Sequence, residues 1–202
     1  MGWVDYIVVA AAGYLLGSIP FAVIIARMCG VDIFKVGSGN PGATNVKRSC
    51  GKTAGNLCFI LDAAKGFAAT AFPLYAGCFG MEFSAPQTLA YVGLVSAIIG
   101  HSFSVFVKFR GGKGVAVTIG GLLAIMWAAI LIGRVLGVVV FYSTRYVSLA
   151  SIAMAVALPV AAAFLYPFPG AQVYIATAIA VVIVVRHRSN IARLIKGTEN
   201  RF

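Results

Sequence analysis

The stretch VAVTIGGLLAIMWAAILIGRVLGVVVFYST, residues 115–144, decides the fold, because its 30 residues carry only one charged side chain, Arg134. A helix needs about 20 apolar residues to cross a membrane, so this stretch is either one tilted helix or two short ones. Basic residues flank it on both sides, at Lys108–Lys113 before it and at Arg145 after it. Basic loops stay on the cytoplasmic side of a membrane, so both ends lie inside and the stretch crosses twice or re-enters. We expect its turn near Arg134, at the outer interface.

Further apolar stretches complete the set of membrane spans. They are Trp3–Ala26, Asn56–Phe79, Thr88–Phe106, Ser148–Tyr166 and Ala171–Val185. Two crossings by residues 115–144 bring the total to seven, and the basic loops then place the N-terminus outside and the C-terminus in the cytoplasm. The sequence therefore predicts an all-α, polytopic integral membrane helical bundle with seven transmembrane helices, and we expect residues 1–202 to form a single domain.

The composition is that of a membrane protein. Hydrophobic residues make up 61% of the 202 and charged residues only 10%, against about 25% charged in a typical soluble domain. The net charge of +11 follows mostly from basic cytoplasmic loops, and no basic and aromatic motif supports nucleic-acid binding. The four cysteines lack C-x-x-C spacing, so we expect no disulfide, no metal site and no cofactor. Met1–Gly13 holds Asp5 as its only charge, which argues against a cleaved signal peptide.

A first polar segment interrupts the apolar chain at Val36–Arg48, with the sequence VGSGNPGATNVKR. Its glycines allow the backbone to approach a ligand closely, and its basic end supplies positive charge. Together they suit a phosphate or a polyol phosphate. The residues that we expect to contact such a substrate are Ser38, Gly39, Asn40, Thr44, Asn45 and Arg48. The alternative is an ordinary connector, since turns also favour Gly, Ser, Asn and Pro.

A second polar segment, Gly100–Gly114, reads GHSFSVFVKFRGGKG and ends in a glycine-rich run. The backbone N–H groups of Gly111, Gly112 and Gly114, with the charge of Lys113, resemble a phosphate cradle. This is not a Walker A loop, because Gly114 stands where that motif has a metal-binding hydroxyl, so ATP hydrolysis is disfavoured. The alternative is that the basic residues of this segment only set the membrane topology.

Ionisable residues also occur within or beside the predicted spans. Asp62 and Lys65 are three residues apart, so they can pair on one helix face, and we expect a mainly structural role for the pair. His101 lies about one turn inside the membrane boundary, and Arg110 follows outside it. Ionisable groups inside a membrane usually mark function, so we count His101 among the expected substrate contacts. We also count Arg110, which belongs to the basic, glycine-rich second segment.

A third polar segment, Arg186–Phe202, reads RHRSNIARLIKGTENRF and follows the last span. His187 and Asn190 are three residues apart, so they share a helix face. Ser148, at the inner end of the span Ser148–Tyr166, either donates to a phosphate or caps its helix. The alternative for the whole segment is a basic tail that stops membrane transfer.

Five segments, in their order along the chain, resemble the bacterial acyl-phosphate:glycerol-3-phosphate acyltransferase family. They are SGNPGATN, LDAAKG, GHSFSVFVKFRGGKGVA, RYVSLAS and RHRSNIARLIKGTENRF. The resemblance implies a bacterial inner (plasma) membrane enzyme of seven helices with its active site toward the cytoplasm. Such an enzyme transfers a fatty acyl group from acyl phosphate to the 1-hydroxyl of sn-glycerol 3-phosphate. The products are lysophosphatidic acid and phosphate, at the first acylation step of phospholipid synthesis.

The same resemblance assigns roles to residues of the polar segments. It implies that Ser38, Lys113 and His187 are catalytic and that Arg48 and Asn190 help to surround the glycerol phosphate. The glycines of Gly111–Gly114 would hold the donor phosphate, with His101 and Ser148 as further substrate contacts. Beyond the two substrates and membrane lipid, the resemblance implies no cofactor and no obligate protein partner.

Such a site needs mainly to orient its substrates, because acyl phosphate is already an activated donor. Orientation of the reactants is worth about 7–11 kcal/mol, and hydrogen-bond donors at the developing oxyanion add to it. The hydroxyl proton has two candidate acceptors, His187 and a phosphate oxygen of the substrate. The H-x-x-x-x-D pattern of another acyltransferase family is missing, since Phe106 stands five residues after His101, and a histidine–aspartate mechanism is disfavoured.

Two other functions use similar features. A transporter for an anionic metabolite would employ the same broken, glycine-rich elements, but it predicts a polar path to the outer face, where the spans are almost free of charge. A structural membrane subunit would leave the polar segments unexplained.

Overall fold

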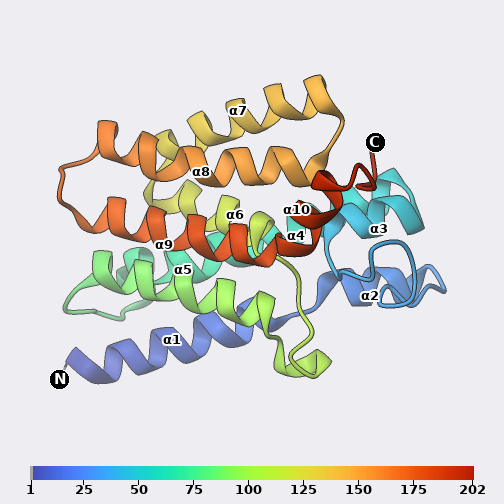
Figure 1. Cartoon of the computed structure of the whole chain (residues 1–202). Helices are drawn as coiled ribbons and strands as arrows, with labels where there is room; N and C mark the ends of the chain where they lie inside the picture. The colour runs from blue at the N-terminus through green and yellow to red at the C-terminus, as the bar shows by residue number, and fades with distance from the viewer. Residues whose placement is uncertain (1) are drawn as a thin grey trace. The chain divides into compact units, whose positions relative to one another are not determined.

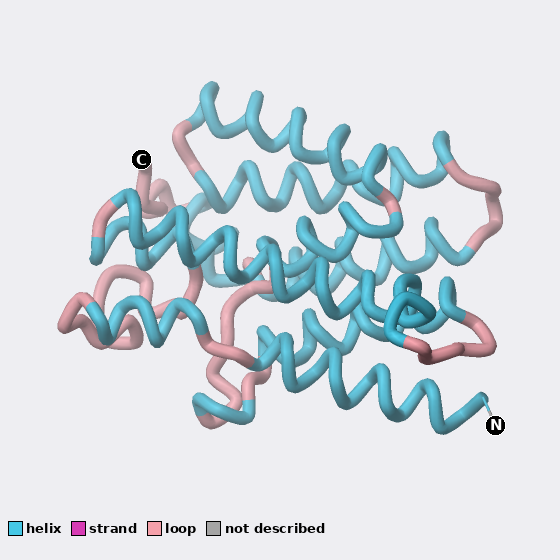
Figure 2. The backbone as a smooth tube through the Cα atoms, turned by 180° about the vertical axis from the view of Figure 1, so that it is seen from behind, coloured by secondary structure: helices cyan, strands magenta, loops and turns pink. Residues whose placement is uncertain are grey.

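The computed structural model describes residues 2–202, and its regular secondary structure over that range is entirely helical (Figure 2). The long helices are α1 (Gly2–Ser18), α4 (Lys52–Tyr75), α5 (Pro86–Ser102), α7 (Trp127–Thr144), α8 (Val147–Leu165) and α9 (Ala171–Arg186). The shorter ones are α2 (Phe21–Met28), α3 (Ala43–Cys50), η1 (Ala76–Phe79), η2 (Val105–Val107), α6 (Val115–Ile125) and α10 (Arg188–Ile195). The predicted all-α fold is confirmed.

The stretch 115–144 forms two helices, α6 and α7, as predicted, but the position expected for the turn is wrong. The helices are separated at Met126, whose backbone leaves the helical region with φ −142° and ψ 45°. Arg134 lies well inside α7. Packing rather than charge sets the break, because α6 packs against α4 while α7 packs against α8.

The chain divides into two compact units at this break, Met1–Ile125 and Met126–Phe202. In the first unit α5 packs along α1 and α4, and α6 packs along α4 (Figure 1). Small residues permit the contact between α4 and α6, since a Cβ on Gly120 would collide with the carbonyl oxygen of Ala63. In the second unit α8 packs against both α7 and α9, and α10 contacts α8 and α9.

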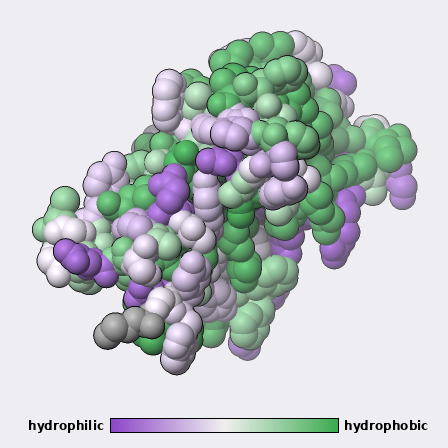
Figure 3. Space-filling view, turned by 90° about the vertical axis from the view of Figure 1, so that its left-hand side faces the viewer, coloured by the Kyte–Doolittle hydropathy of each residue, from purple (hydrophilic) through white to green (hydrophobic). Residues whose placement is uncertain are grey.

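Among the described residues, five helical segments are long and apolar enough to cross a membrane. They are Gly2–Met28, Lys52–Phe79, Pro86–Val107, Trp127–Thr144 and Val147–Leu165. The pair α9 and α10, bent by 58°, raises the number to six if it counts as one span. The surface shows large hydrophobic areas with polar side chains gathered in patches (Figure 3), as expected of a protein solvated by lipid.

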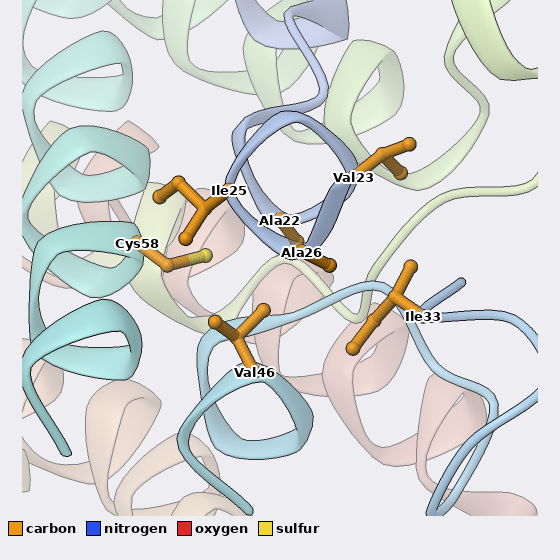
Figure 4. Packing of buried hydrophobic residues seen from close by; sticks show 7 residues of the cluster. All are labelled: Ala22, Val23, Ile25, Ala26, Ile33, Val46 and Cys58. Atoms are coloured by element: carbon orange, nitrogen blue, oxygen red, sulfur yellow. The ribbon is translucent and has the colours of Figure 1, made fainter. Parts of the chain in front are cut away.

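A hydrophobic cluster attaches the first polar loop to the membrane helices (Figure 4). Ala26 of α2, Val46 of α3 and Cys58 of α4 are fully buried against one another, and Ile33 joins them from the connecting loop. Burying an aliphatic side chain of this size contributes about 1.5–3 kcal/mol, so the cluster holds α3 firmly. The loop that ends at the start of α3 therefore has a rigid base.

Candidate functional site

The first polar loop, residues 31–42, is held in shape by the side chain of Asn45. Its amide Nδ2 donates to the carbonyl oxygens of Ile33, at 3.2 Å, and Val36, at 3.0 Å. Its Oδ1 accepts a hydrogen bond from the backbone N–H of Ser38 at 3.1 Å. Asn45 is only 2% exposed. We expected the Asn45 side chain to contact substrate, but its hydrogen bonds hold the loop in shape instead.

The loop presents Ser38 at its surface. Gly37 and Gly39 on either side of it have φ values of +56° and +66°, which only glycine adopts readily. The Ser38 hydroxyl accepts a hydrogen bond from the backbone N–H of Asn40 at 3.4 Å. Thr44, in the first turn of α3, is half-buried. Arg48 lies in the last turn of the same helix, so α3 carries both polar and basic groups of the first segment.

The second polar loop, residues 103–114, folds back on the end of α5. The N–H of Phe109 donates to the carbonyl oxygen of Ser104 at 2.8 Å, and the N–H of Gly112 donates to that of His101 at 3.0 Å. Lys108 and Phe109 take left-handed φ values of 56° and 60°, which reverse the chain direction. The glycines are therefore laid against the last turn of α5.

Glycine is required at two positions of this loop because there is no room for a side chain. A Cβ on Gly111 would collide with the carbonyl oxygen of His101, and a Cβ on Gly112 would collide with Nε2 of the His101 ring. The same Cβ would lie 3.1 Å from the carbonyl oxygen of Pro41, so the first and second loops meet at Gly112. Lys113 follows directly, half-buried, and Gly114 precedes the first residue of α6.

Arg110 also joins the two loops. Its guanidinium carbon lies 4.3 Å from the centre of the Phe34 ring, a cation–π contact. We expected Arg110 to contact substrate, and the structure places it, exposed, on an aromatic ring of the first loop. Its most direct effect is to hold the loops together.

A buried polar cluster lies beneath the second loop. The predicted pair is present, with Lys65 Nζ 2.8 Å from Asp62 Oδ1. Nδ1 of His101 lies 3.6 Å from the same oxygen. Sequence spacing argued against a histidine–aspartate pair, because the aspartate comes from another helix far away along the chain. A cavity in the first unit is lined by this cluster and both loops, including Pro41, Asp62, Lys65, His101, Arg110 and Gly112.

In the second unit, Glu199 brings together two of the expected substrate contacts. Its Oε1 accepts hydrogen bonds from Ser148 Oγ at 3.0 Å and from Asn190 Nδ2 at 2.7 Å. Arg193 Nε donates to Oε2 at 2.7 Å. Sequence reasoning passed over Glu199, although it is the only acid in the basic tail. The carboxylate ties the start of α8, α10 and the C-terminal tail together.

Burial alone would raise the pKa of the Glu199 carboxyl, but hydrogen bonds from Asn190, Arg193 and Ser148 hold the pKa below its ordinary value. The ordinary value is about 4.3, so the contribution of the carboxylate to stability is complete above about pH 5 and is lost as the pH falls through the folded-state pKa. We expect the thermal midpoint of detergent-solubilised protein to fall with acidification in this range. Glu199→Gln should be less stable at pH 7 and should lose less on acidification, whereas Glu82→Gln, at an exposed acid, should behave as wild type. Equal acid sensitivity in the Glu199→Gln variant would contradict this assignment.

His187 lies at the junction of α9 and α10, where the chain bends. The residue is 3% exposed, and its Nδ1 lies 2.8 Å from the carbonyl oxygen of Ile183. That contact favours the tautomer with the proton on Nδ1, which makes Nε2 the basic nitrogen. Because His187 lies at this junction, the bend between α9 and α10 sets the direction of its ring.

Comparisons with known proteins show which family this chain resembles. A family model described as glycerol-3-phosphate acyltransferase matches residues 7–197. A glycerol-3-phosphate acyltransferase of Laribacter hongkongensis is 47% identical over 93% of this chain and 92% of its own length. One from Aquifex aeolicus is 42% identical over 94% of this chain and 95% of its own. The crystal structure of PlsY (YgiH), an integral membrane glycerol 3-phosphate acyltransferase in its glycerol 3-phosphate form, is similar with a TM-score of 0.87. It is 38% identical and the match covers 98% of this chain and 95% of that one.

Proposed function

Because this chain belongs to the glycerol-3-phosphate acyltransferase family, we propose that it takes its acyl group from an acyl phosphate and transfers it to the 1-hydroxyl of sn-glycerol 3-phosphate. The observation that carries the choice of donor is the meeting of the two loops at Gly112, next to Lys113. An acyl phosphate has its phosphate directly beside the reacting carbonyl. One anion cradle can therefore bind the donor and stabilise its leaving group.

The reaction needs one bond to form and one to break. The hydroxyl oxygen of glycerol 3-phosphate attacks the acyl carbonyl carbon, and the bond from that carbon to the phosphate oxygen breaks. Lysophosphatidic acid forms and inorganic phosphate leaves with the bonding electrons. The Lys113 ammonium stabilises the charge on that phosphate, together with backbone N–H groups of the Gly111–Gly114 run other than that of Gly112, which donates to the His101 carbonyl oxygen.

The hydroxyl proton has two candidate acceptors. Nε2 of His187 is one, because its Nδ1 faces the Ile183 carbonyl. A phosphate oxygen of the substrate is the other. Ser38 and Arg48 are assigned to the phosphate of glycerol 3-phosphate. Asn190 and Ser148, the other expected substrate contacts, both donate to the carboxylate of Glu199.

We further propose seven crossings in the bacterial inner membrane, with the N-terminus outside, the C-terminus inside and the polar loops toward the cytoplasm. The distribution of basic residues supports this, since the loops that carry them alternate with loops that contain no lysine or arginine. The seventh crossing would be α6, whose 11 residues span only about 16 Å and need shelter from neighbouring helices. Reporter fusions after Phe202 that are active only outside the cytoplasm would contradict this topology.

The activity is tested by phosphate release. Purified protein in detergent should release phosphate from palmitoyl phosphate only when glycerol 3-phosphate is present, and lysophosphatidic acid should form in equal amount. Acyl-CoA and acyl-carrier protein serve as comparison donors. Product formation from either of these, with none from acyl phosphate, would refute the proposed donor while leaving the acyltransferase family intact.

A further inference from the structure

The buried cluster of Asp62, Lys65 and His101 is more than a neutralised ion pair. The three residues are 1%, 4% and 8% exposed, and the first two lie inside a helix that can span the membrane. Burying charge there is costly, and one lysine beside one aspartate would suffice to balance it. The Asp62 carboxylate, however, also faces the ring of His101, which comes from a different helix.

His101 connects this carboxylate to the glycine loop. Its ring has Nδ1 toward Asp62 and Nε2 against Gly112, on the side where a Cβ would stand. Its carbonyl oxygen accepts the N–H of Gly112 at 3.0 Å. A ring turned away from Asp62 would change its contact with the loop, because only the missing side chain of Gly112 makes room for Nε2.

The other end of the cluster is attached to the break between α1 and α2. Lys65 Nζ donates to the carbonyl oxygen of Ile19 at 2.7 Å and lies 5.5 Å from the centre of the Phe21 ring. The second loop is attached to the same break, since Ser104 Oγ donates to the carbonyl oxygen of Ser18 at 2.6 Å. The cluster and the loop therefore share one rigid support.

We propose that Asp62 is a positioning residue for the acyl-phosphate end of the reaction: its carboxylate orients His101, and His101 sets the position of Gly111 and Gly112. This inference rests on the proposed function, because the loop is the assigned site of the donor phosphate. A site held by such supporting contacts loses rate when they are removed, even though they touch no substrate.

The test measures steady-state kinetics with palmitoyl phosphate and glycerol 3-phosphate varied separately. Asp62→Asn should raise KM for the acyl phosphate by between about tenfold and 100-fold, with KM for glycerol 3-phosphate nearly unchanged. His101→Gln should have a similar effect. Because Asp62 acts through His101, the Asp62→Asn/His101→Gln double variant should be no worse than the more impaired single variant.

A second variant separates positioning from folding. Asp62→Asn/Lys65→Gln removes both charges, so it should recover the thermal midpoint lost in Asp62→Asn while its KM for acyl phosphate stays high. Recovery of both would overturn the proposal, as would additive effects of Asp62→Asn and His101→Gln. If neither Asp62 variant folds, His101→Gln is the deciding variant, because it leaves the ion pair of Asp62 and Lys65 intact. A normal KM for acyl phosphate in His101→Gln would then overturn the proposal.

The proposed function fails separately, in the wild type. If the wild type uses a different acyl donor, the donor assignment is wrong, and the same KM comparison is made with the donor that it uses. A donor-specific effect of Asp62→Asn would then still support the positioning role, and an equal effect on both substrates would overturn it.

Discussion

Lys113→Ala should lower the turnover number by roughly 100- to 1000-fold, the usual effect of removing one donor from the site where charge develops. Lys113 follows Gly112 directly, at the point where the two polar loops meet. In the proposed mechanism its ammonium stabilises the departing phosphate, so we expect the charge on that phosphate to be less stabilised without it. Phosphate release from palmitoyl phosphate in the presence of glycerol 3-phosphate measures the effect.

Two comparisons give this prediction its meaning. Arg48→Ala, on α3, should also lose most turnover, through weaker binding of glycerol 3-phosphate. Lys35→Ala removes a lysine from the first loop whose side chain is 83% exposed, and it should leave the rate close to wild type. Near-normal rates in both Lys113→Ala and Arg48→Ala would remove the phosphate contacts from the proposed mechanism.

Gly112→Ala should lower kcat/KM by roughly 100-fold or more, because the added methyl group forces the loop away from the end of α5. The methyl carbon would collide with Nε2 of His101 and lie 3.1 Å from the carbonyl oxygen of Pro41. Either the ring or the loop must move, and both belong to the proposed donor site. Kinetics and the thermal midpoint are measured on the same preparation.

A glycine elsewhere in the same unit provides the matched control. A Cβ on Gly77, in η1, meets nothing within 4 Å, so Gly77→Ala should keep both rate and midpoint. The alanine variant at position 112 should keep most of its thermal stability, since only a loop is displaced. Wild-type activity of Gly112→Ala would show that the loop position does not matter for the reaction.

The sequence by itself determined that lipid surrounds most of this protein and that its secondary structure is helical. Long apolar runs such as Asn56–Phe79 can satisfy their backbone hydrogen bonds in lipid only as helices. Spacing of three residues sufficed to predict the pair of Asp62 and Lys65, because helix geometry places such residues on one face. Glycine-rich composition likewise marked both polar loops. Gly37 and Gly39 adopt left-handed backbone angles, and Gly111 and Gly112 lie where a side chain has no room.

Tertiary structure alone decided which of those polar residues contact one another. The break at Met126, rather than near Arg134, follows from α6 and α7 packing on different helices. Asp62 reaches His101, and Glu199 reaches Ser148, across segments far apart in the chain. Hydropathy and spacing report only on neighbours along one helix, whereas a hydrogen bond between two elements depends on how their surfaces pack. The sequence therefore indicates that residues 115–144 form two helices, and packing decides the residue at which they are broken.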